Sequence, residues 1–227
     1  MPVISRLLLR SVDQSRSNSV SQQMRVRRFA QFERAAAQLP RPLNVIDLGG
    51  TTEYWEHRGW AGRDDVRITL VNLEADEQRH ENVIPTVGDA CDLSAHDDDS
   101  VDLVFSNSMI EHLFTAERQH TMAAEVRRVA RAYWIQTPNY WFPVEPHFLR
   151  IGWQWRPVEM RVRALQRGPV GQIGHCPDHD VAEHHVREVR LLARGEFARM
   201  FPDATLVAER LGGLVKSWTA VKGMTVG

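Results

Sequence analysis

Cysteine is scarce in this chain. Only Cys91 and Cys176 occur among its 227 residues. Two cysteines are too few for a disulfide framework, so we expect reduced thiols and a cytoplasmic location. Long hydrophobic runs are also lacking, because Arg6 and Arg10 interrupt the apolar stretch at residues 7–9. We therefore expect neither a secretory leader nor a membrane span.

An excess charge of either sign is lacking as well. The formal net charge is -1, so no global field draws the chain toward nucleic acid or an anionic membrane. We expect a small-molecule substrate and no nucleic-acid partner. No internal repeat is visible, and 43% hydrophobic content over 227 residues suits one domain with embellishments. The sequence leaves the oligomeric state open.

The first 39 residues are predicted to be an N-terminal arm and a helix. Residues 11–23 are rich in Ser, Gln and Asn without an apolar period, and we expect a mobile arm there. Residues 24–39 place apolar side chains loosely at helical spacing. The arginines between them, Arg25, Arg27 and Arg28, are expected to form a solvated helix face.

Short apolar runs bounded by turn-forming residues predict seven strands. They cover residues 43–48, 66–73, 82–87, 100–106, 132–137, 204–210 and 214–221. Helical stretches, the clearest at 115–130, are expected between the strands. The alternation predicts an α/β fold with a Rossmann-like, doubly wound, mostly parallel seven-stranded sheet. The last two runs predict an antiparallel C-terminal hairpin, joined by Leu211, Gly212 and Gly213.

The least regular segment, residues 138–185, follows the fifth strand within the main domain, residues 40–227. It is rich in Trp and Pro. Ligands of open parallel sheets bind beyond the carboxyl ends of the strands, so this aromatic-rich insertion is expected to cover the substrate. Part of it, residues 157–166, is predicted to be helical. Candidate substrate-binding residues are Asn139, Tyr140 and Trp141, with a Pro-stiffened loop packed on the core as the equal alternative.

A group of histidines near residue 180 raises the question of a metal site. The group comprises His175, Cys176, Asp178, His179, Asp180, His184 and His185. Imidazole and thiolate suit zinc, but the spacing matches no tight ligand pattern. We expect an exposed loop that leads into a helix, and no bound metal.

Small and polar residues follow four successive predicted strands. They are Asp47, Gly49, Gly50 and Thr51 after the first, Asn72, Leu73 and Glu74 after the second, Asp89 and Ala90 after the third, and Asn107 and Ser108 after the fourth. Small residues let the backbone approach a ligand closely, and the following helix start offers unpaired N–H groups. A nucleotide-like cofactor is therefore predicted at this edge of the sheet.

At these motifs the chain resembles class I S-adenosylmethionine-dependent methyltransferases, especially the type 11-like group that methylates small molecules. The family pattern is acid-x-Gly-x-Gly-x-Gly after the first strand, and residues 88–90 and 100–113, with their Glu-His-Leu ending, resemble its third and fourth strand regions. The resemblance covers much of residues 40–140. Two departures are present: Thr51 and Glu53 replace later glycines, and Asn72 replaces the usual strand-end acid.

The resemblance implies that S-adenosylmethionine is the cofactor and assigns its contacts. Asp47 and Gly49 would flank the methionine part, Asn72 or Glu74 would hold the ribose, Asp89 with Ala90 would meet the adenine, and Asn107 would lie near the sulfonium. The implied reaction is in-line methyl transfer to a small or mid-sized organic acceptor, with O-methylation favoured.

A hydroxyl acceptor requires a base, and the candidates are His112, His147 and Glu145. For His112 the structural alternative is a helix-start residue packed against the sheet. Two other functions stay open. The first is an NAD(P)-dependent oxidoreductase, although its Gly-x-Gly-x-x-Gly fingerprint lacks the third glycine here. The second is a non-catalytic relative that only binds the cofactor.

Overall fold

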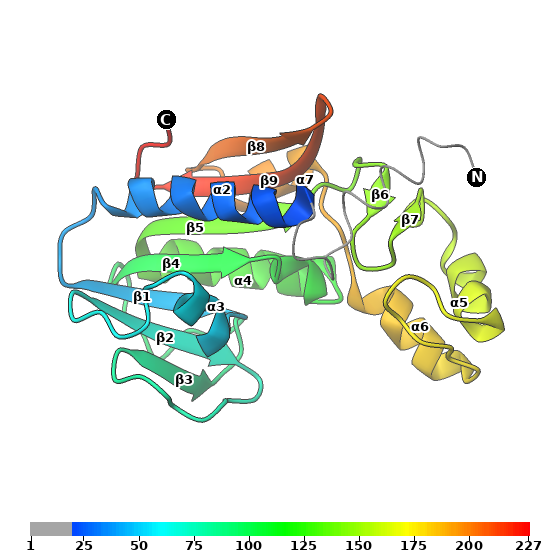
Figure 1. Ribbon diagram of the computed structural model, residues 1–227, viewed down its shortest axis with the longest axis horizontal. Coiled ribbons are helices and arrows are strands. Elements are labelled where there is room, and N and C mark those ends of the chain that lie inside the picture. The colour runs from blue at the N-terminus through cyan, green and yellow to red at the C-terminus, as the bar shows by residue number, and fades with distance from the viewer. Residues whose placement is uncertain (1–19) are drawn as a thin grey trace.

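Seven strands form one sheet in the order β3-β2-β1-β4-β5-β9-β8 in the computed structural model, which describes residues 20–227 (Figure 1). The strands are β1 Leu43–Leu48, β2 Val66–Asn72, β3 Val83–Val87, β4 Val101–Asn107, β5 Ala130–Pro138, β8 Thr205–Leu211 and β9 Leu214–Lys222. The first five are parallel, whereas β9 runs antiparallel to β5 and β8 antiparallel to β9. The predicted sheet and its C-terminal hairpin are confirmed.

The strand order reverses between β1 and β4, which pair directly with Asp47 opposite Phe105. In an open parallel sheet, the connections after two such strands leave in opposite directions and open a crevice at their carboxyl ends. The polar residues that follow β1 and β4 therefore share one edge of the sheet.

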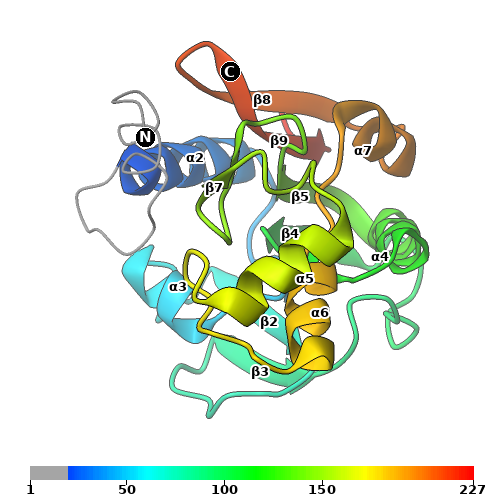
Figure 2. The same cartoon turned by 90° about the vertical axis from the view of Figure 1, so that its right-hand side faces the viewer.

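Helices cover both faces of the sheet (Figure 2). One layer contains α2 Val20–Ala36 and α3 Thr52–His57, and the other contains α4 Ala116–Val129 and α7 Arg194–Met200. Phe32 and Trp55 anchor the first layer and Met122 and Phe197 the second, all fully buried against the strands. Within the described residues no helix is long and apolar enough to cross a membrane.

The N-terminal helix begins earlier than the sequence predicts. Residues 11–19 of the expected arm lie outside the described residues, while residues 20–23 already belong to α2. The prediction of a start at residue 24 is therefore wrong. The helix ends at Ala36, before the two prolines that precede β1. Its Gln22 lines a cavity at the carboxyl edge of the sheet, so the first turns of α2 are part of the site region.

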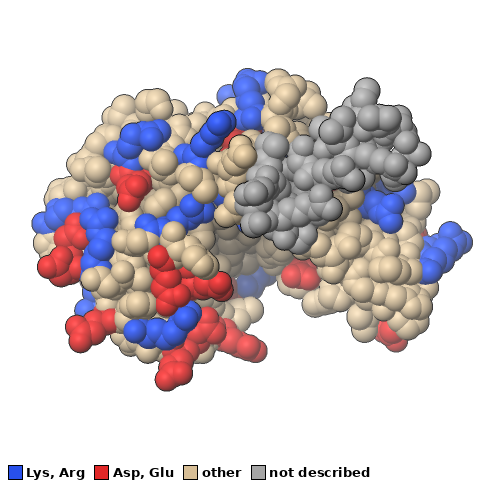
Figure 3. Space-filling model, viewed as in Figure 1, with Lys and Arg blue, Asp and Glu red and all other residues tan. Residues whose placement is uncertain are grey.

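The expectation of a helix in every connection is also wrong. The connections between β2 and β3 and between β3 and β4 contain no helix. Residues 74–82 carry almost no apolar side chains, so a helix there would have no stripe to bury against the sheet. Their acidic side chains are exposed instead, and Figure 3 shows acidic groups gathered over the β2–β3 edge.

The insertion after β5 packs around a small hydrophobic cluster of its own. It contains β6 Val144–Glu145, β7 Arg150–Ile151, α5 Val158–Arg167 and α6 His179–Glu188. Phe148, Trp153 and Leu165 are buried in this cluster. Its helices lie beyond the carboxyl ends of the parallel strands (Figure 1). The predicted helix at 157–166 is confirmed as α5, one residue further along.

Both ends of the insertion lie side by side at the sheet. The Tyr140 N–H donates to the Leu192 carbonyl at 3.0 Å, and the Asn139 N–H donates to the Lys216 carbonyl of β9 at 2.9 Å. These bonds continue the sheet pairing past the end of β5. The chain thus leaves the sheet and returns to it at nearly the same point.

Candidate active site

The glycine turn after β1 is tightly constrained by its neighbours. Gly49 has a φ of +80°, which L side chains rarely adopt, and its N–H donates to the Val71 carbonyl at 3.0 Å. A Cβ at Gly50 would overlap the carboxyl group of Asp47. Thr51 closes the turn, because its Oγ1 accepts the Tyr54 N–H at 3.2 Å and caps α3. A helix cap thus replaces the family's later glycine.

Asp47 is 1% exposed at the end of β1 and has one orphaned oxygen. Its Oδ2 accepts a hydrogen bond from Trp55 Nε1 at 2.8 Å, whereas Oδ1 has no partner among the described residues. Burial raises the pKa of this carboxyl to about 7. Asp47 lines a cavity of about 190 Å³ together with Gly49, Gly50, Thr51, Tyr54, Phe105 and Asn107. An unsatisfied buried acceptor beside a tight glycine turn fits the ammonium-bearing methionine part of S-adenosylmethionine.

The residues after β2 lie next to this turn, outside the wall of the cavity. Asn72 Nδ2 donates to the Gly50 carbonyl at 2.8 Å, so its amide supports the glycine turn. Leu73 and Val87 are 76% and 68% exposed. Two such apolar side chains at the ends of adjacent strands offer a surface that suits the flat adenine ring. Glu74, two residues beyond Asn72, is exposed.

Asp89 carries an ionised carboxylate after β3. It accepts hydrogen bonds from the Cys91 N–H at 2.9 Å and from Arg118 Nη2 at 2.9 and 3.0 Å. Partial burial raises the pKa of Asp89, but the hydrogen bonds from Cys91 and Arg118 outweigh that effect and hold it below its usual value. Ala90 is buried beside it.

Asn107 ends β4 and Ser108 follows it, and side-chain hydrogen bonds fix both residues. Asn107 Oδ1 accepts from Arg28 Nη1 at 2.7 Å, and Arg28 also pairs with Glu209 of β8 at 2.9 Å. Ser108, with a φ of +59°, donates its Oγ hydrogen to Gln136 at 2.8 Å. Both residues line a second, larger cavity.

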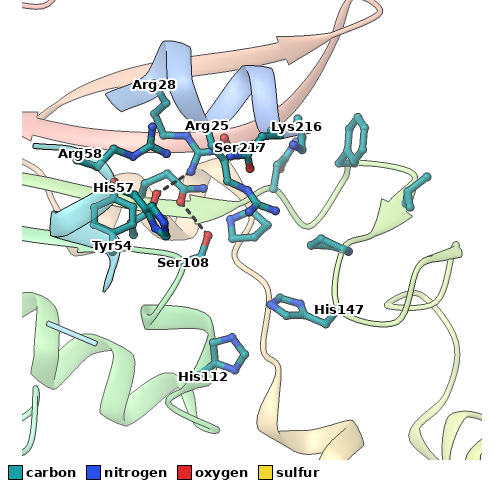
Figure 4. Close-up of a pocket in the computed structure, with 18 residues that line it drawn as sticks. Arg25, Arg28, Tyr54, His57, Arg58, Ser108, His112, His147, Lys216 and Ser217 are labelled. Atoms are coloured by element: carbon teal, nitrogen blue, oxygen red, sulfur yellow. Dashed lines mark hydrogen bonds between the residues drawn. The ribbon is translucent and has the colours of Figure 1, made fainter. Parts of the chain in front are cut away.

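This larger cavity measures about 450 Å³, and Figure 4 shows residues that line it. Tyr54 and Asn107 line both cavities, so the two spaces share a wall at the carboxyl ends of β1 and β4. Its other lining residues come from α2, the end of α3 and the residue after it, the segment after β4, the end of β5, the insertion and β9: Gln22, Arg25, Arg28, His57, Arg58, Ser108, His112, Gln136, Pro138, Asn139, Phe142, Val144, Pro146, His147, Lys216 and Ser217.

One side of this cavity is strongly basic. Arg25, Arg28, Arg58 and Lys216 converge there in Figure 4. Burial lowers the pKa of Lys216 to about 8; Glu209 opposes the shift, while Arg28 and Arg25 add to it. Burial also lowers the pKa of Arg25, whose buried Nη2 has no hydrogen-bond partner among the described residues.

The expected solvated arginine face is confirmed only for Arg27, which is exposed. It is wrong for Arg25 and Arg28, which are half-buried against the cavity. Their spacing of three residues places both on one face of a helix. This spacing is the feature of the sequence from which their common position could be predicted.

The structure places the three candidate bases at two different positions relative to the larger cavity. His112 and His147 line the larger cavity, whereas Glu145 is 2% exposed behind His147 and outside the lining. Glu145 Oε1 accepts a hydrogen bond from His147 Nδ1 at 2.6 Å, and its Oε2 accepts the Phe148 N–H at 2.6 Å. Burial lowers the pKa of His147, but the hydrogen bond to Glu145 and the charges of Glu145, Glu111 and Glu188 together outweigh that effect and leave it raised.

His112 ends the short 3-10 helix Ile110–His112 and is half-buried. The residue that packs against the sheet is its neighbour Glu111, whose Oε2 accepts from Thr137 of β5 at 3.0 Å. The Glu-His-Leu motif contains Glu111, but sequence reasoning gave it no role.

Only one of the three candidate substrate-binding residues after β5 lies at the larger cavity. Asn139 lines the larger cavity, and its Nδ2 donates to the Val215 carbonyl at 2.8 Å. Tyr140 and Trp141 are absent from the lining, and Trp141 is 64% exposed. The histidine-rich segment near residue 180 has the predicted form, an exposed loop that leads into α6, capped by Asp178.

A profile of the methyltransferase domain family matches residues 48–132. These residues run from the end of β1 into β5 and contain the glycine turn and the motifs after β2, β3 and β4. They form a methyltransferase domain. The prediction of a class I S-adenosylmethionine-dependent methyltransferase is confirmed, and S-adenosylmethionine is the cofactor. This match favours methyl transfer over the nicotinamide alternative. No curated protein matches the chain.

Solved methyltransferases share the fold at low identity. The N-methyltransferase NodS from Bradyrhizobium japonicum WM9 is 11% identical, covering 87% of this chain and 93% of that one with a TM-score of 0.50. The CurJ carbon methyltransferase is 13% identical, covering 84% of this chain and 51% of that one with a TM-score of 0.51. A SAM-dependent methyltransferase from Aquifex aeolicus is 13% identical, covering 83% of this chain and 85% of that one, with a lower TM-score of 0.44.

Proposed function

We propose that this methyltransferase methylates a small or mid-sized organic acceptor that carries an anionic group. The supporting observation is the basic cavity of about 450 Å³, which shares Tyr54 and Asn107 with the smaller cavity beside the glycine turn. A methyl donor in the smaller space and an acceptor in the larger one would meet at this shared wall. In-line transfer needs such an alignment more than covalent help from the protein.

The geometry at the end of each strand supports an assignment of the cofactor contacts. We assign the methionine part to Asp47, Gly49, Gly50 and Thr51, and the sulfonium side to Asn107 and Ser108. Glu74 is assigned to the ribose, because the Asn72 amide already supports Gly50. Leu73, Asp89 and Ala90 are assigned to the adenine.

The anionic character of the acceptor rests on the balance of charge around the larger cavity. Four cationic side chains face it, and Glu209 pairs with one of them, Arg28. Burial lowers the pKa of Arg25, with Arg28 and Arg58 adding to the shift, and burial lowers the pKa of Lys216, with Arg28 and Arg25 adding to it. A carboxylate or phosphate on the acceptor would offset this repulsion and supply a partner for the orphaned Arg25 Nη2.

Activation of the acceptor is assigned to the imidazoles of His112 and His147, which face the cavity opposite the basic side (Figure 4). A hydroxyl must lose its proton during methyl transfer, so the presence of these groups favours O-methylation. Glu145 is a positioning residue, because both of its oxygens are engaged by His147 and Phe148. The insertion, residues 138–185, is proposed to be the substrate-side part of the domain, with Asn139 at the cavity and Tyr140 and Trp141 toward its outer rim.

Two measurements test this function. Calorimetric titration with S-adenosylmethionine and its demethylated product should show saturable binding of both. Transfer of radiolabelled methyl groups should then be measured on hydroxylated carboxylic acids and on their neutral methyl esters. We expect the acids to have the higher kcat/KM, and a preference for the esters would contradict an anionic acceptor.

Matched variants connect the charge preference to the cavity. Arg25→Gln should raise KM for the acid by roughly tenfold, corresponding to a charge-assisted hydrogen bond of about 1.5 kcal/mol, with little change in cofactor binding. Arg27→Gln is the control, since Arg27 is exposed on the same helix outside the larger cavity. Equal KM values for the two variants would remove Arg25 from the acceptor site.

A further inference from the structure

Three metal-ligating side chains meet where the 3-10 helix faces the insertion. Ligand atoms of Glu111, His112 and His147 all lie within 4.8 Å of one another. The two imidazole rings are perpendicular at 89°, with centroids 4.8 Å apart. In the part of the chain that the structure describes, this is the one group of at least three such residues close enough to share an ion. The histidine-rich segment near residue 180 forms no comparable group there.

Glu111 supplies an independent sign that a ligand is missing. Its side chain is 0% exposed, and its Oε1 has no hydrogen-bond partner among the described residues. A buried carboxylate oxygen without a donor is costly, and a bound cation is one of the few groups that satisfies it. The other oxygen, Oε2, accepts from Thr137 at 3.0 Å, which fixes the carboxylate between β5 and the histidines.

His147 has the second carboxylate partner that is typical of metal ligands, and His112 has a carboxylate at ion-pair distance. His147 Nδ1 bonds to Glu145 at 2.6 Å, and His112 Nδ1 lies 3.5 Å from Glu188 Oε1 of α6. When a carboxylate holds the Nδ1 hydrogen, the Nε2 lone pair is oriented for a metal. Glu145 lies on β6 and Glu188 lies on α6, so this arrangement forms only when the insertion is folded.

We propose that Glu111, His112 and His147 bind a divalent transition-metal ion, with zinc as the ion that this ligand set suits. Two imidazoles and one carboxylate form a common catalytic zinc set, which leaves a position for an exogenous oxygen. Ligands at about 2.1 Å from a tetrahedral ion lie roughly 3.4 Å apart. Small side-chain rotations therefore bring the three ligand atoms to that spacing.

The ion would lie at the wall of the larger cavity, because His112 and His147 line it. There it could bind an acceptor oxygen and lower the pKa of a hydroxyl, which would then lose its proton to solvent before methyl transfer. This role toward the acceptor rests on the proposed function: with the ion bound, His112 and His147 would activate the hydroxyl as metal ligands rather than as free bases. The metal site itself does not rest on the proposed function.

Metal binding by the full chain tests the site directly. Protein freed of metal with a chelator should bind one Zn²⁺ per chain in a calorimetric titration. Added Co²⁺ should give the visible absorption bands of a low-coordinate nitrogen and oxygen site. His112→Ala and His147→Ala should each weaken Zn²⁺ binding by more than tenfold, and Glu111→Gln should do the same while keeping the shape of the side chain.

Controls separate loss of the site from loss of the fold. His175→Ala and His179→Ala remove exposed histidines elsewhere and should bind Zn²⁺ like the wild type. Every variant should bind S-adenosylmethionine as the wild type does, since none of the three ligands lines the smaller cavity. Absence of saturable one-to-one Zn²⁺ binding would overturn the proposal, as would wild-type binding by a His112→Ala/His147→Ala double variant. Neither result would bear on binding of S-adenosylmethionine or on acceptor charge.

Discussion

Arg28 Nη1 donates a hydrogen bond of 2.7 Å to Oδ1 of Asn107, which joins the N-terminal helix to the carboxyl end of β4. The Nε and Nη2 atoms of the same guanidinium donate to the two oxygens of Glu209 at 3.2 and 2.9 Å. One side chain thus links α2, β4 and β8. The orientation of the Asn107 amide, at the wall that both cavities share, depends on this arginine.

Replacing Arg28 with Met should therefore affect both stability and cofactor binding. The Arg28 and Glu209 side chains are only 11% and 17% exposed, so removing one partner leaves a largely buried charge, at a cost of about 2 kcal/mol. Urea denaturation should show this loss, and calorimetry should show weaker binding of S-adenosylmethionine. Arg27→Met should stay within about 0.5 kcal/mol of the wild type. Equal stability of the two variants would contradict the bridging role.

Asp47 should make stability depend on pH. Its pKa is raised by burial to about 7 in the folded chain, whereas an unfolded Asp titrates near 4. Between these values the folded state holds a proton that the unfolded state has lost. The contribution of Asp47 is therefore fully present below about pH 4 and is lost as the pH rises through 7.

Asp47→Asn should remove this pH dependence, because the amide has no proton to lose. The stability of the variant relative to the wild type should rise between pH 5 and pH 8, by about 2.5 kcal/mol. Urea denaturation at four pH values measures this difference, with the exposed Asp76→Asn as the control. A constant difference over this range would show that Asp47 is already ionised at pH 5.

Gly50→Ala should weaken cofactor binding without removing the fold. The added Cβ would overlap the Asp47 carboxyl, so the turn must shift, at about 1–3 kcal/mol of overpacking. Because this turn lines the cavity assigned to the cofactor, its displacement should weaken binding of S-adenosylmethionine roughly tenfold to hundredfold. Gly174→Ala is the matched control, because a Cβ there meets nothing within 4 Å. Unchanged binding in Gly50→Ala would move the cofactor away from this turn.

Lys216 should impose an alkaline limit on binding of an anionic acceptor. Its pKa is lowered by burial to about 8, with Glu209 opposing the shift and Arg28 and Arg25 adding to it. Raising the pH from 7 to 9 should therefore remove its charge and raise KM for the acceptor, with a smaller change in kcat. Lys216→Met should have a high KM at both pH values. A pH profile that is the same in wild type and variant would assign the alkaline limit to another group.

The sheet could be predicted well because each strand is a short apolar run between turn residues. Leu43–Leu48 matches its predicted bounds, and the other strands differ by one or two residues. The polar residues after β1 and β4 could also be placed, since parallel strands bring their carboxyl ends to one edge. The absence of a helix after β2 was foreseeable from residues 74–82, which have no apolar stripe to bury.

The basic side of the acceptor cavity could not be predicted, because it depends on tertiary packing. Arg25 and Arg28 have the pattern of a solvated face until α2 packs across the end of β9 and turns them toward Lys216. Glu111 presents the same problem. In sequence it is one acid beside a histidine, and only the folded insertion brings His147 within 4.8 Å of its carboxylate.

The two ends of the insertion adjoin, because Asn139 and Tyr140 donate hydrogen bonds to the carbonyls of Lys216 and Leu192. The insertion is therefore a cassette, a segment that can be exchanged without disturbing the sheet. A segment that starts and finishes at one place on a sheet can change in length or sequence while the strands on either side keep their register. Descendants of this chain could therefore acquire new acceptors by exchanging the cassette, with the glycine turn and its methyl donor left as they are.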